Sequence, residues 1–340
     1  MRVLELFAGI GACSKALKRI GIDTEIVDAV EIDKYAMSSF NAIHNTNFET
    51  QDITTWNKNL KDIDLITHGS PCQDFSVAGK QAGGDLGSGT RSSLMYETIR
   101  IVGQVRPKYV LWENVKNILS KKHKHNFDSY IEIMDKLGYN SYYEVLNAKD
   151  YGIPQNRERV YTISIRKDID KGTFIFPEKE ELKLRLKNML EDEVDKKYYL
   201  SESSIKNLQR SFGSKTKEVE PDGICYTLQA AMGCGGGNVP VLKVIGKLDI
   251  KGHDCVKRVY SVEGIAPTLT DMQGGNRQPK IIDNPLIRKL TPKECWRLMG
   301  FSDEDFEKAA NIPTSNTQLY KQAGNSIVVN VLEKIFENLF

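Results

Sequence analysis

The sequence lacks the features that mark membrane-spanning, disulfide-rich and zinc-binding proteins. It has no uninterrupted run of about 18 apolar residues, so no segment is expected to cross a membrane. Its six cysteines are irregularly spaced and include no C-x-x-C pair, which argues against a disulfide framework and favours reduced thiols in the cytoplasm. The short apolar start carries Glu5 and is interpreted as a first strand, not as an export signal. We predict no metal, because the spacing of a common structural zinc site is absent from the possible ligands Cys225, Cys234, His253 and Cys255.

The chain also lacks a strong net charge, at +2 over 340 residues, which excludes a uniformly basic nucleic-acid-binding protein. Charge is nevertheless uneven, since residues 241–293 hold ten Lys or Arg against five Asp or Glu. A second basic cluster spans residues 116–125. Such clusters are either ordinary solvated faces or localised contacts with a polyanion, and charge alone favours the solvated faces.

Apolar strand patterns alternate with amphipathic helical patterns in the first half of the chain. This alternation predicts an α/β fold with a doubly wound, mostly parallel sheet of the Rossmann-like type. Ligands of such sheets bind beyond the carboxyl ends of the strands, so Gly9, Cys72 and Glu113 are expected at one edge. The predicted strands are residues 3–7, 26–30, 63–67, 109–112, 141–146 and 159–165, and the predicted helices are residues 12–20, 92–105 and 127–137.

The pattern changes after about residue 167 and predicts a smaller inserted domain. We assign residues 168–290 to it, residues 1–167 with 310–340 to the main domain, and residues 291–309 to a hinge. Helices are predicted at 291–299 and 326–339, and the latter has an apolar stripe that would pack on the main domain. The inserted region contains two similar segments, GICYTL before GGGN and GIAPTL before GGN. They are either ordinary hairpin turns or glycine tips that let the backbone approach a ligand.

The segment FAGIGA at residues 7–12 follows the first strand and opens a helix. Glu31 lies 22 positions after Gly9, a spacing that suits a carboxylate accepting hydrogen bonds from a ribose diol. Ser14 stands where a dinucleotide-binding loop has its third glycine, so a nucleoside without a pyrophosphate fits better. Phe7 could offer its ring to an adenine. Taken alone, the glycines are equally explained by strand-to-helix packing.

Three further motifs carry reactive side chains beside predicted strands. Cys72 sits in GSPCQDFS, where Pro71 stiffens the approach and a glycine-rich stretch follows, an arrangement typical of a nucleophile. Glu113 follows an apolar strand and could serve acid–base chemistry. Arg157 and Arg159 would point to the same side by strand alternation. Each charged residue on its own is more simply a surface charge, but together the set is specific.

Over nearly its full length, and in the same order of motifs, the chain resembles the DNA cytosine-5 methyltransferases of bacterial restriction-modification systems. The motifs that carry the resemblance are FAGIGA, GSPCQDFS, ENV, QNRERV, RKLTPKECWRLMGF and YKQAGNSIVVNV. The resemblance implies transfer of a methyl group from S-adenosylmethionine, which becomes S-adenosylhomocysteine, to C5 of a cytosine in double-stranded DNA. It also implies a monomer, encoded by a bacterium or a phage, that protects DNA from restriction. The inserted region would be the target-recognition domain.

The same resemblance assigns roles to individual residues. The Cys72 thiolate would attack C6 of a cytosine turned out of the duplex, Glu113 would hold the N3 edge, and Arg159 with Arg157 would hold O2. The cofactor contacts would be Phe7, Gly9, Gly11, Glu31, Ile32, Asp52, Ile53, Pro71 and Asn325. The DNA contacts would be Gln73, Ser76, Gln81, Arg91, Thr227, Gly236, Thr268 and Gly274.

Three other functions compete with this interpretation. A cytosine-5 methyltransferase acting on tRNA would carry the same motifs, although the sizeable variable region favours DNA. A catalytically silent DNA-binding protein is disfavoured by the intact set of Cys72, Glu113, Arg157 and Arg159. A nucleotide-dependent oxidoreductase is disfavoured by Ser14 in place of the third glycine.

Overall fold

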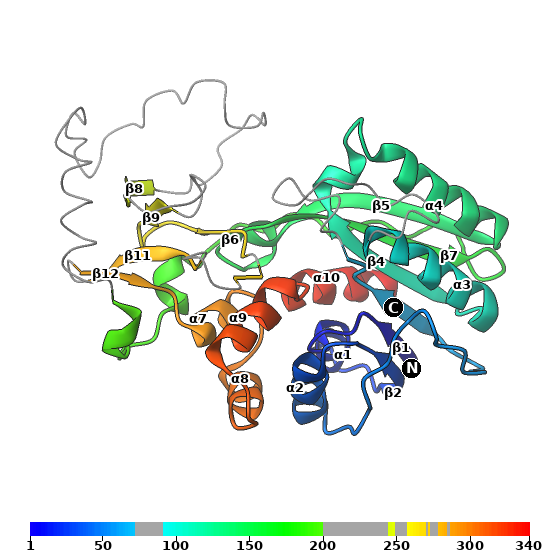
Figure 1. The fold of residues 1–340 in the computed structure, drawn as a ribbon. Coiled ribbons are helices and arrows are strands. Elements are labelled where there is room, and N and C mark those ends of the chain that lie inside the picture. The colour runs from blue at the N-terminus through cyan, green and yellow to red at the C-terminus, as the bar shows by residue number, and fades with distance from the viewer. Residues whose placement is uncertain (72–90, 200–243, 249–256, 270, 273–277, 284–285) are drawn as a thin grey trace.

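The fold comes from a computed structural model of the chain (Figure 1). The residues it describes are 1–71, 91–199, 244–248, 257–269, 271–272, 278–283 and 286–340. No helix within these ranges is long and apolar enough to cross a membrane.

A six-stranded sheet in the order β2-β1-β3-β4-β7-β5 organises the main domain. The first four strands in this order pair in parallel, and β7 runs antiparallel between β4 and β5. The predicted mostly parallel sheet is thus confirmed. Its strands are β1 (Arg2–Leu6), β2 (Glu25–Val30), β3 (Leu65–His68), β4 (Tyr109–Val115), β5 (Tyr139–Asn147) and β7 (Glu158–Arg166).

Helices cover both faces of this sheet (Figure 1). On one face α1 (Ala12–Arg19) packs against α10 (Val329–Leu339), and the apolar stripe of α10 is buried as predicted. On the other face α3 (Met95–Val105) packs against α4 (Lys124–Lys136) in a second apolar cluster. Short 3₁₀ turns connect the elements, at η1 (Arg91–Leu94), η2 (Lys116–Leu119), η3 (Ala148–Tyr151), η4 (Leu186–Met189) and η5 (Lys196–Tyr198).

Several elements differ from the sequence-based expectation. Glu113 lies within β4, not after it, because the ladder with β7 continues to Val115. The helix expected from residue 326 begins at Val329. The helices α2 (Lys34–His44), α8 (Asp303–Ala310) and α9 (Asn316–Asn325) were not predicted from the sequence. Each is preceded by a polar N-cap residue whose side chain accepts at least one backbone N–H group of the first turn.

A smaller sheet lies apart from the large one, with the strand order β12-β11-β9-β8 (Figure 1). Its strands are β8 (Val244–Lys247), β9 (Arg258–Tyr260), β11 (Lys280–Asp283) and β12 (Leu286–Lys289). A fully buried ion pair joins it to α7 (Pro292–Arg297), because Arg288 donates to both carboxylate oxygens of Glu294 at 2.8 and 2.9 Å. The GIAPTL segment contributes β10 (Ala266–Pro267), which pairs with β6 (Gln155–Asn156), whereas the GICYTL segment falls outside the described residues.

A buried histidine at the end of β3 gives the fold a testable pH dependence. His68 is 1% exposed and stacks on Trp112, and burial lowers its pKa to about 3. In the unfolded chain this imidazole takes up a proton near pH 6.5. The free energy of unfolding that depends on the neutral imidazole is therefore present above pH 6.5 and falls as the pH drops toward 3. Between pH 7 and pH 5, the free energy of unfolding should therefore fall by about 2 kcal/mol less in His68→Phe than in the wild-type protein. Urea unfolding of both proteins at the two pH values measures this, and equal losses would contradict it.

Candidate active site

The candidate active site lies at the carboxyl edge of the parallel strands. The register places Leu6, His68 and Trp112 side by side in β1, β3 and β4. Glu113 follows this line directly and Gly9 lies three residues after Leu6, so the expectation that these two lie at one edge is confirmed, whereas Cys72 lies outside the described residues. The strand order reverses between β2 and β3 on either side of β1, which is where α/β sheets of this kind bind ligands.

The glycine loop after β1 folds back onto the end of β2. Its backbone takes left-handed conformations at Phe7, Gly9 and Gly11, with φ of 51°, 56° and 80°. The Gly9 N–H donates to Glu31 Oε2 at 3.0 Å, and the Asp33 N–H donates to Oε1 at 2.8 Å. Burial raises the pKa of Glu31, and these two backbone bonds counteract the rise. The expected proximity of the loop and Glu31 is therefore present.

A second carboxylate, in β1, bonds to the helix that follows the glycine loop. Glu5, in β1, is 2% exposed and accepts from the Ser14 N–H at 3.0 Å and from the Ser14 hydroxyl. Ser14 lies in the first turn of α1, so Glu5 satisfies a backbone donor that the helix leaves unpaired. Burial raises the pKa of Glu5 to about 7. The serine that replaces the third glycine thus has a structural partner, which the sequence analysis did not foresee.

The remaining predicted cofactor contacts lie on several different segments and differ in exposure. Ile32 is 70% exposed directly beside Glu31, and Ile53 is buried in the core. Asp52 is exposed and accepts from the backbone and hydroxyl of Thr54 at 2.9 and 2.8 Å. Pro71 is half-buried after β3, and Asn325 is exposed at the last position of α9.

The segment YKQAGN holds α9 against the acidic end of β2. Lys321 forms an ion pair with Asp33, the residue that caps α2, and the Gln322 amide donates to the Tyr35 carbonyl at 3.0 Å. Sequence reasoning missed Asp33, Lys321 and Gln322 as neighbours of the Glu31 site. The partners are 287 and 288 residues apart, so no local spacing in the sequence relates them. The YKQAGN motif was the feature of the sequence that could have indicated these contacts.

Glu113 and Arg159 meet across the antiparallel strands β4 and β7. Arg159 pairs with Val115 in the ladder and Glu113 with Tyr161, so the two side chains are diagonal neighbours on one face. The Arg159 Nε lies 3.0 Å from Glu113 Oε1, and both side chains are largely buried. This contact lacks hydrogen-bond geometry, and Oε1 accepts no hydrogen bond from the described residues. The two charges therefore neutralise each other, while Oε1 of Glu113 accepts no hydrogen bond from the described residues.

Arg157 is more deeply buried than Arg159 and bonds to the backbone of distant segments. Its guanidinium donates to the carbonyls of Leu269, Gly324 and Ser326 at 2.9, 3.2 and 2.8 Å. These carbonyls belong to the segment after β10 and to the end of α9. The side chain thereby ties the GIAPTL segment and the C-terminal part to the start of β7, which fits the supporting role predicted beside Arg159.

The other predicted DNA contacts are mostly beyond the described residues. Arg91 is the first residue of η1. The Thr268 hydroxyl donates to the Asn156 carbonyl at 2.6 Å, so it helps to dock β10 on β6. The residues outside the described ranges are Cys72, Gln73, Ser76, Gln81, Thr227, Gly236 and Gly274, together with the cysteines and histidine weighed for zinc. Within the described ranges no group of three His, Cys, Asp or Glu could hold a metal ion.

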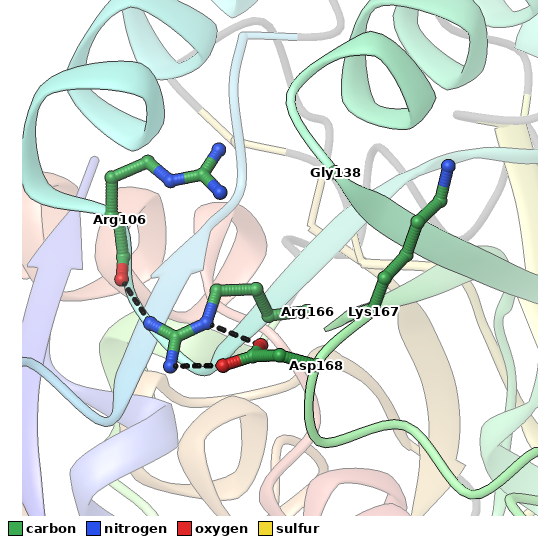
Figure 2. A pocket seen from close by; sticks show the side chains of 5 residues that line it. All are labelled: Arg106, Gly138, Arg166, Lys167 and Asp168. Carbon is green, nitrogen blue, oxygen red and sulfur yellow. Dashed lines mark hydrogen bonds and ion pairs between the residues drawn. The ribbon is translucent and has the colours of Figure 1, made fainter.

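A hollow of about 420 Å³ lies at the opposite, amino edge of the sheet (Figure 2). Arg166 donates there to both carboxylate oxygens of Asp168, at 2.7 and 3.0 Å, and to the Arg106 carbonyl at 2.8 Å. Lys167 is paired with Asp135 at 2.7 Å. Two of the three cations that line the hollow are thus neutralised, and it lies away from the strand ends that gather Gly9 and Glu113.

A family model described as C-5 cytosine-specific DNA methylase matches residues 1–340. The chain is 35% identical to the orphan methyltransferase M.SPBetaI of Bacillus phage SPbeta, with 100% of this chain and 97% of the relative covered. It is 34% identical to the type II methyltransferase M.HhaI of Haemophilus parahaemolyticus, with 100% of this chain and 94% of the relative covered.

Solved structures show the same fold at lower sequence identity. The Entamoeba histolytica methyltransferase EhMeth superposes with a TM-score of 0.70 at 18% identity, covering 100% of this chain and 98% of that one. The S. pombe Dnmt2 methyltransferase superposes with a TM-score of 0.66 at 19% identity, with 99% of this chain and 96% of that one covered.

Proposed function

The chain belongs to the C-5 cytosine-specific DNA methylases, and from this premise we propose how it selects and methylates its cytosine. The substrate is a cytosine turned out of a short specific site in duplex DNA. The observation that carries the proposal is the Glu113–Arg159 pair, which lies at the strand edge to which β3 leads residues 69–71, directly before Cys72 in the sequence. The relatives M.SPBetaI and M.BsuMIIP come from a Bacillus phage and from Bacillus subtilis, so we propose that the chain acts as a monomer in the bacterial cytoplasm and protects DNA from restriction.

The loop around Gly9 fits S-adenosylmethionine, which supplies the methyl group when bound. A Cβ placed on Gly9 would meet nothing within 4 Å, so the loop borders open space. Each oxygen of Glu31 accepts one backbone N–H and retains a lone pair for a ribose hydroxyl. The exposed Ile32 offers apolar surface beside it for an adenine. No pyrophosphate cradle is needed, in agreement with Ser14 in place of a third glycine.

Two glycines with similar backbone geometry test this cofactor site. Gly9 and Gly21 have φ of 56° and 79°, and neither has an atom within 4 Å of an added Cβ. An alanine at either position should therefore lower the free energy of unfolding by about 1 kcal/mol, because alanine disfavours the left-handed backbone conformation. We expect Gly9→Ala to weaken S-adenosylmethionine binding at least about tenfold, since its methyl group enters the ligand space, and Gly21→Ala to leave it unchanged. Calorimetric titration decides, and equal affinities of the two variants would exclude this loop as the site.

The catalytic roles follow from the chemistry of cytosine, whose C5 is a poor nucleophile. The Cys72 thiolate attacks C6, and the ring electrons move to C5, which then accepts the methyl group. Glu113 holds the N3 edge, while Arg159 holds O2 and remains charged throughout because a guanidinium keeps its proton. A base removes the C5 proton, and the thiolate leaves C6. Arg157 supports Arg159 through its bonds to three backbone carbonyls.

The smaller region provides the reading of the DNA sequence. We assign residues 168–290 to target recognition, with 291–309 as the hinge and 1–167 with 310–340 as the catalytic domain. The assignment of residues 168–290 is supported by the separate sheet β12-β11-β9-β8, which Figure 1 shows apart from the large sheet. Basic side chains of this region would position phosphates, and side chains near Thr268 and its glycine tips would read bases in the major groove.

A methyl-transfer assay with two acceptors tests the proposed function. Purified protein is incubated with tritiated S-adenosylmethionine and either duplex DNA or tRNA, and bisulfite sequencing of DNA from expressing cells identifies the methylated site. Label is expected in the duplex DNA, at cytosines of one short sequence. Label confined to tRNA would establish the alternative substrate, and binding of DNA without label would establish a silent DNA-binding protein.

A further inference from the structure

Ser70 is buried at the point where the pairing of β3 with β4 ends. The ladder between the two strands stops at His68 and Trp112, and Ser70 follows two residues later with 3% exposure. A buried hydroxyl and carbonyl need partners once the ladder can no longer supply them. Cys72 comes two residues after Ser70 in the sequence, so the direction of the chain at Ser70 bears on where the nucleophile loop begins.

Side chains of β4 take over where the ladder stops. The indole N–H of Trp112 donates to the Ser70 hydroxyl at 3.0 Å. The amide of Asn114 lies 3.5 Å from the Ser70 carbonyl, at the limit of hydrogen bonding. Glu113 lies between these two residues and points to the opposite face of the strand. Three successive residues of β4 therefore hold both the approach to Cys72 and the carboxyl group of the site.

The Trp112 ring cannot turn away from Ser70. It is fully buried and stacks on both His68 and Phe127, at ring separations of 5.6 and 5.7 Å and interplanar angles of 5° and 17°. Tyr130, from α4, packs at 4.1 Å. An indole N–H is a donor only, so its single bond goes to Ser70 and would leave an unpaired buried donor if the loop moved.

We propose that Trp112 is a positioning residue for the nucleophile. Its N–H bond to Ser70 fixes the chain two residues before Cys72 in the sequence, which would let the thiol and the Glu113 carboxyl group act on the same cytosine. This inference rests on the proposed role of Cys72. It predicts an effect on the attack at C6 but not on the binding of DNA or cofactor, because Trp112 is buried behind the strand edge.

Covalent trapping with S-adenosylmethionine on duplex DNA that contains 5-fluorocytosine reports the attack at C6 together with the methyl transfer, because fluorine at C5 blocks only the final elimination. We expect Trp112→Phe, which retains a ring but not the N–H, to slow adduct formation about 10- to 100-fold. Ser70→Ala should slow it similarly, and the double variant should be no slower than either single one. The KM for DNA and the affinity for S-adenosylmethionine should stay within about twofold of wild type.

Trp296→Phe is the matched control for loss of a buried indole bond. Trp296 is fully buried in α7 and donates to the Leu319 carbonyl at the same 3.0 Å. This variant should lower the melting temperature as Trp112→Phe does but form the adduct at the wild-type rate. Wild-type adduct formation by Ser70→Ala and Trp112→Phe, or additive effects in the double variant, would overturn the positioning role. Adduct formation by Cys72→Ser would instead overturn the proposed function itself.

Discussion

Replacing Cys72 by serine is expected to lower the rate of methyl transfer by roughly 10⁴-fold or more. A thiolate is available near neutral pH, whereas a serine hydroxyl keeps its proton and attacks C6 very poorly. Affinity for duplex DNA should persist, because phosphate contacts supply most of the binding energy and do not involve the thiol. The variant should therefore separate binding from chemistry.

The measurement combines a tritiated methyl assay with gel shifts on the same duplex. Cys295→Ala provides the control for cysteine loss, since this thiol is buried in α7 and burial raises its pKa well above the usual range. The control should keep its turnover. Substantial turnover by Cys72→Ser would remove Cys72 from the role of nucleophile, whatever the DNA affinity.

The sequence predicted those features that depend on local pattern. Strand periodicity located β1 and β4 along the chain, and parallel pairing then brought Gly9 and Glu113 to one edge. The spacing of Glu31 after Gly9 predicted a carboxylate beside the loop, which the bond between Gly9 and Glu31 reproduces. Both inferences work because a β-α-β unit converts sequence spacing into a fixed spatial relation.

Features that depend on distant side chains were not predictable in this way. The partners of Arg157 lie 112 to 169 residues away, and Lys321 reaches Asp33 over 288 residues. No periodicity encodes such contacts, because they follow from how complete elements pack. Trp112 illustrates the same limit, since its position in a strand predicted burial but not the bond to Ser70. Glu113 was misplaced by the expected strand end, because only pairing with β7 extends β4 to Val115.

Glu113→Gln is expected to slow adduct formation and turnover by about 10²- to 10⁴-fold while leaving S-adenosylmethionine affinity unchanged. Glutamine matches glutamate in shape, so the buried space beside Arg159 remains filled. The amide cannot share a proton with N3 as the thiolate attacks C6, and Arg159 loses the carboxyl group 3.0 Å from its Nε. Charge that develops on the cytosine ring is then stabilised by Arg159 alone.

Glu158→Gln tests whether this loss comes from the site or from charge in general. Glu158 begins β7 one residue before Arg159, is largely exposed and pairs with Lys116 at 3.0 Å, so its amide variant removes a neighbouring negative charge from the surface. Single-turnover trapping on 5-fluorocytosine DNA compares both variants with wild type. A loss in Glu113→Gln alone shows that the attack on C6 depends on the carboxyl group of Glu113 itself, because Arg157 and its three carbonyl partners hold the start of β7 in both proteins. An equal loss in both variants would show that the rate responds to local charge and that Glu113 has no specific part in the attack.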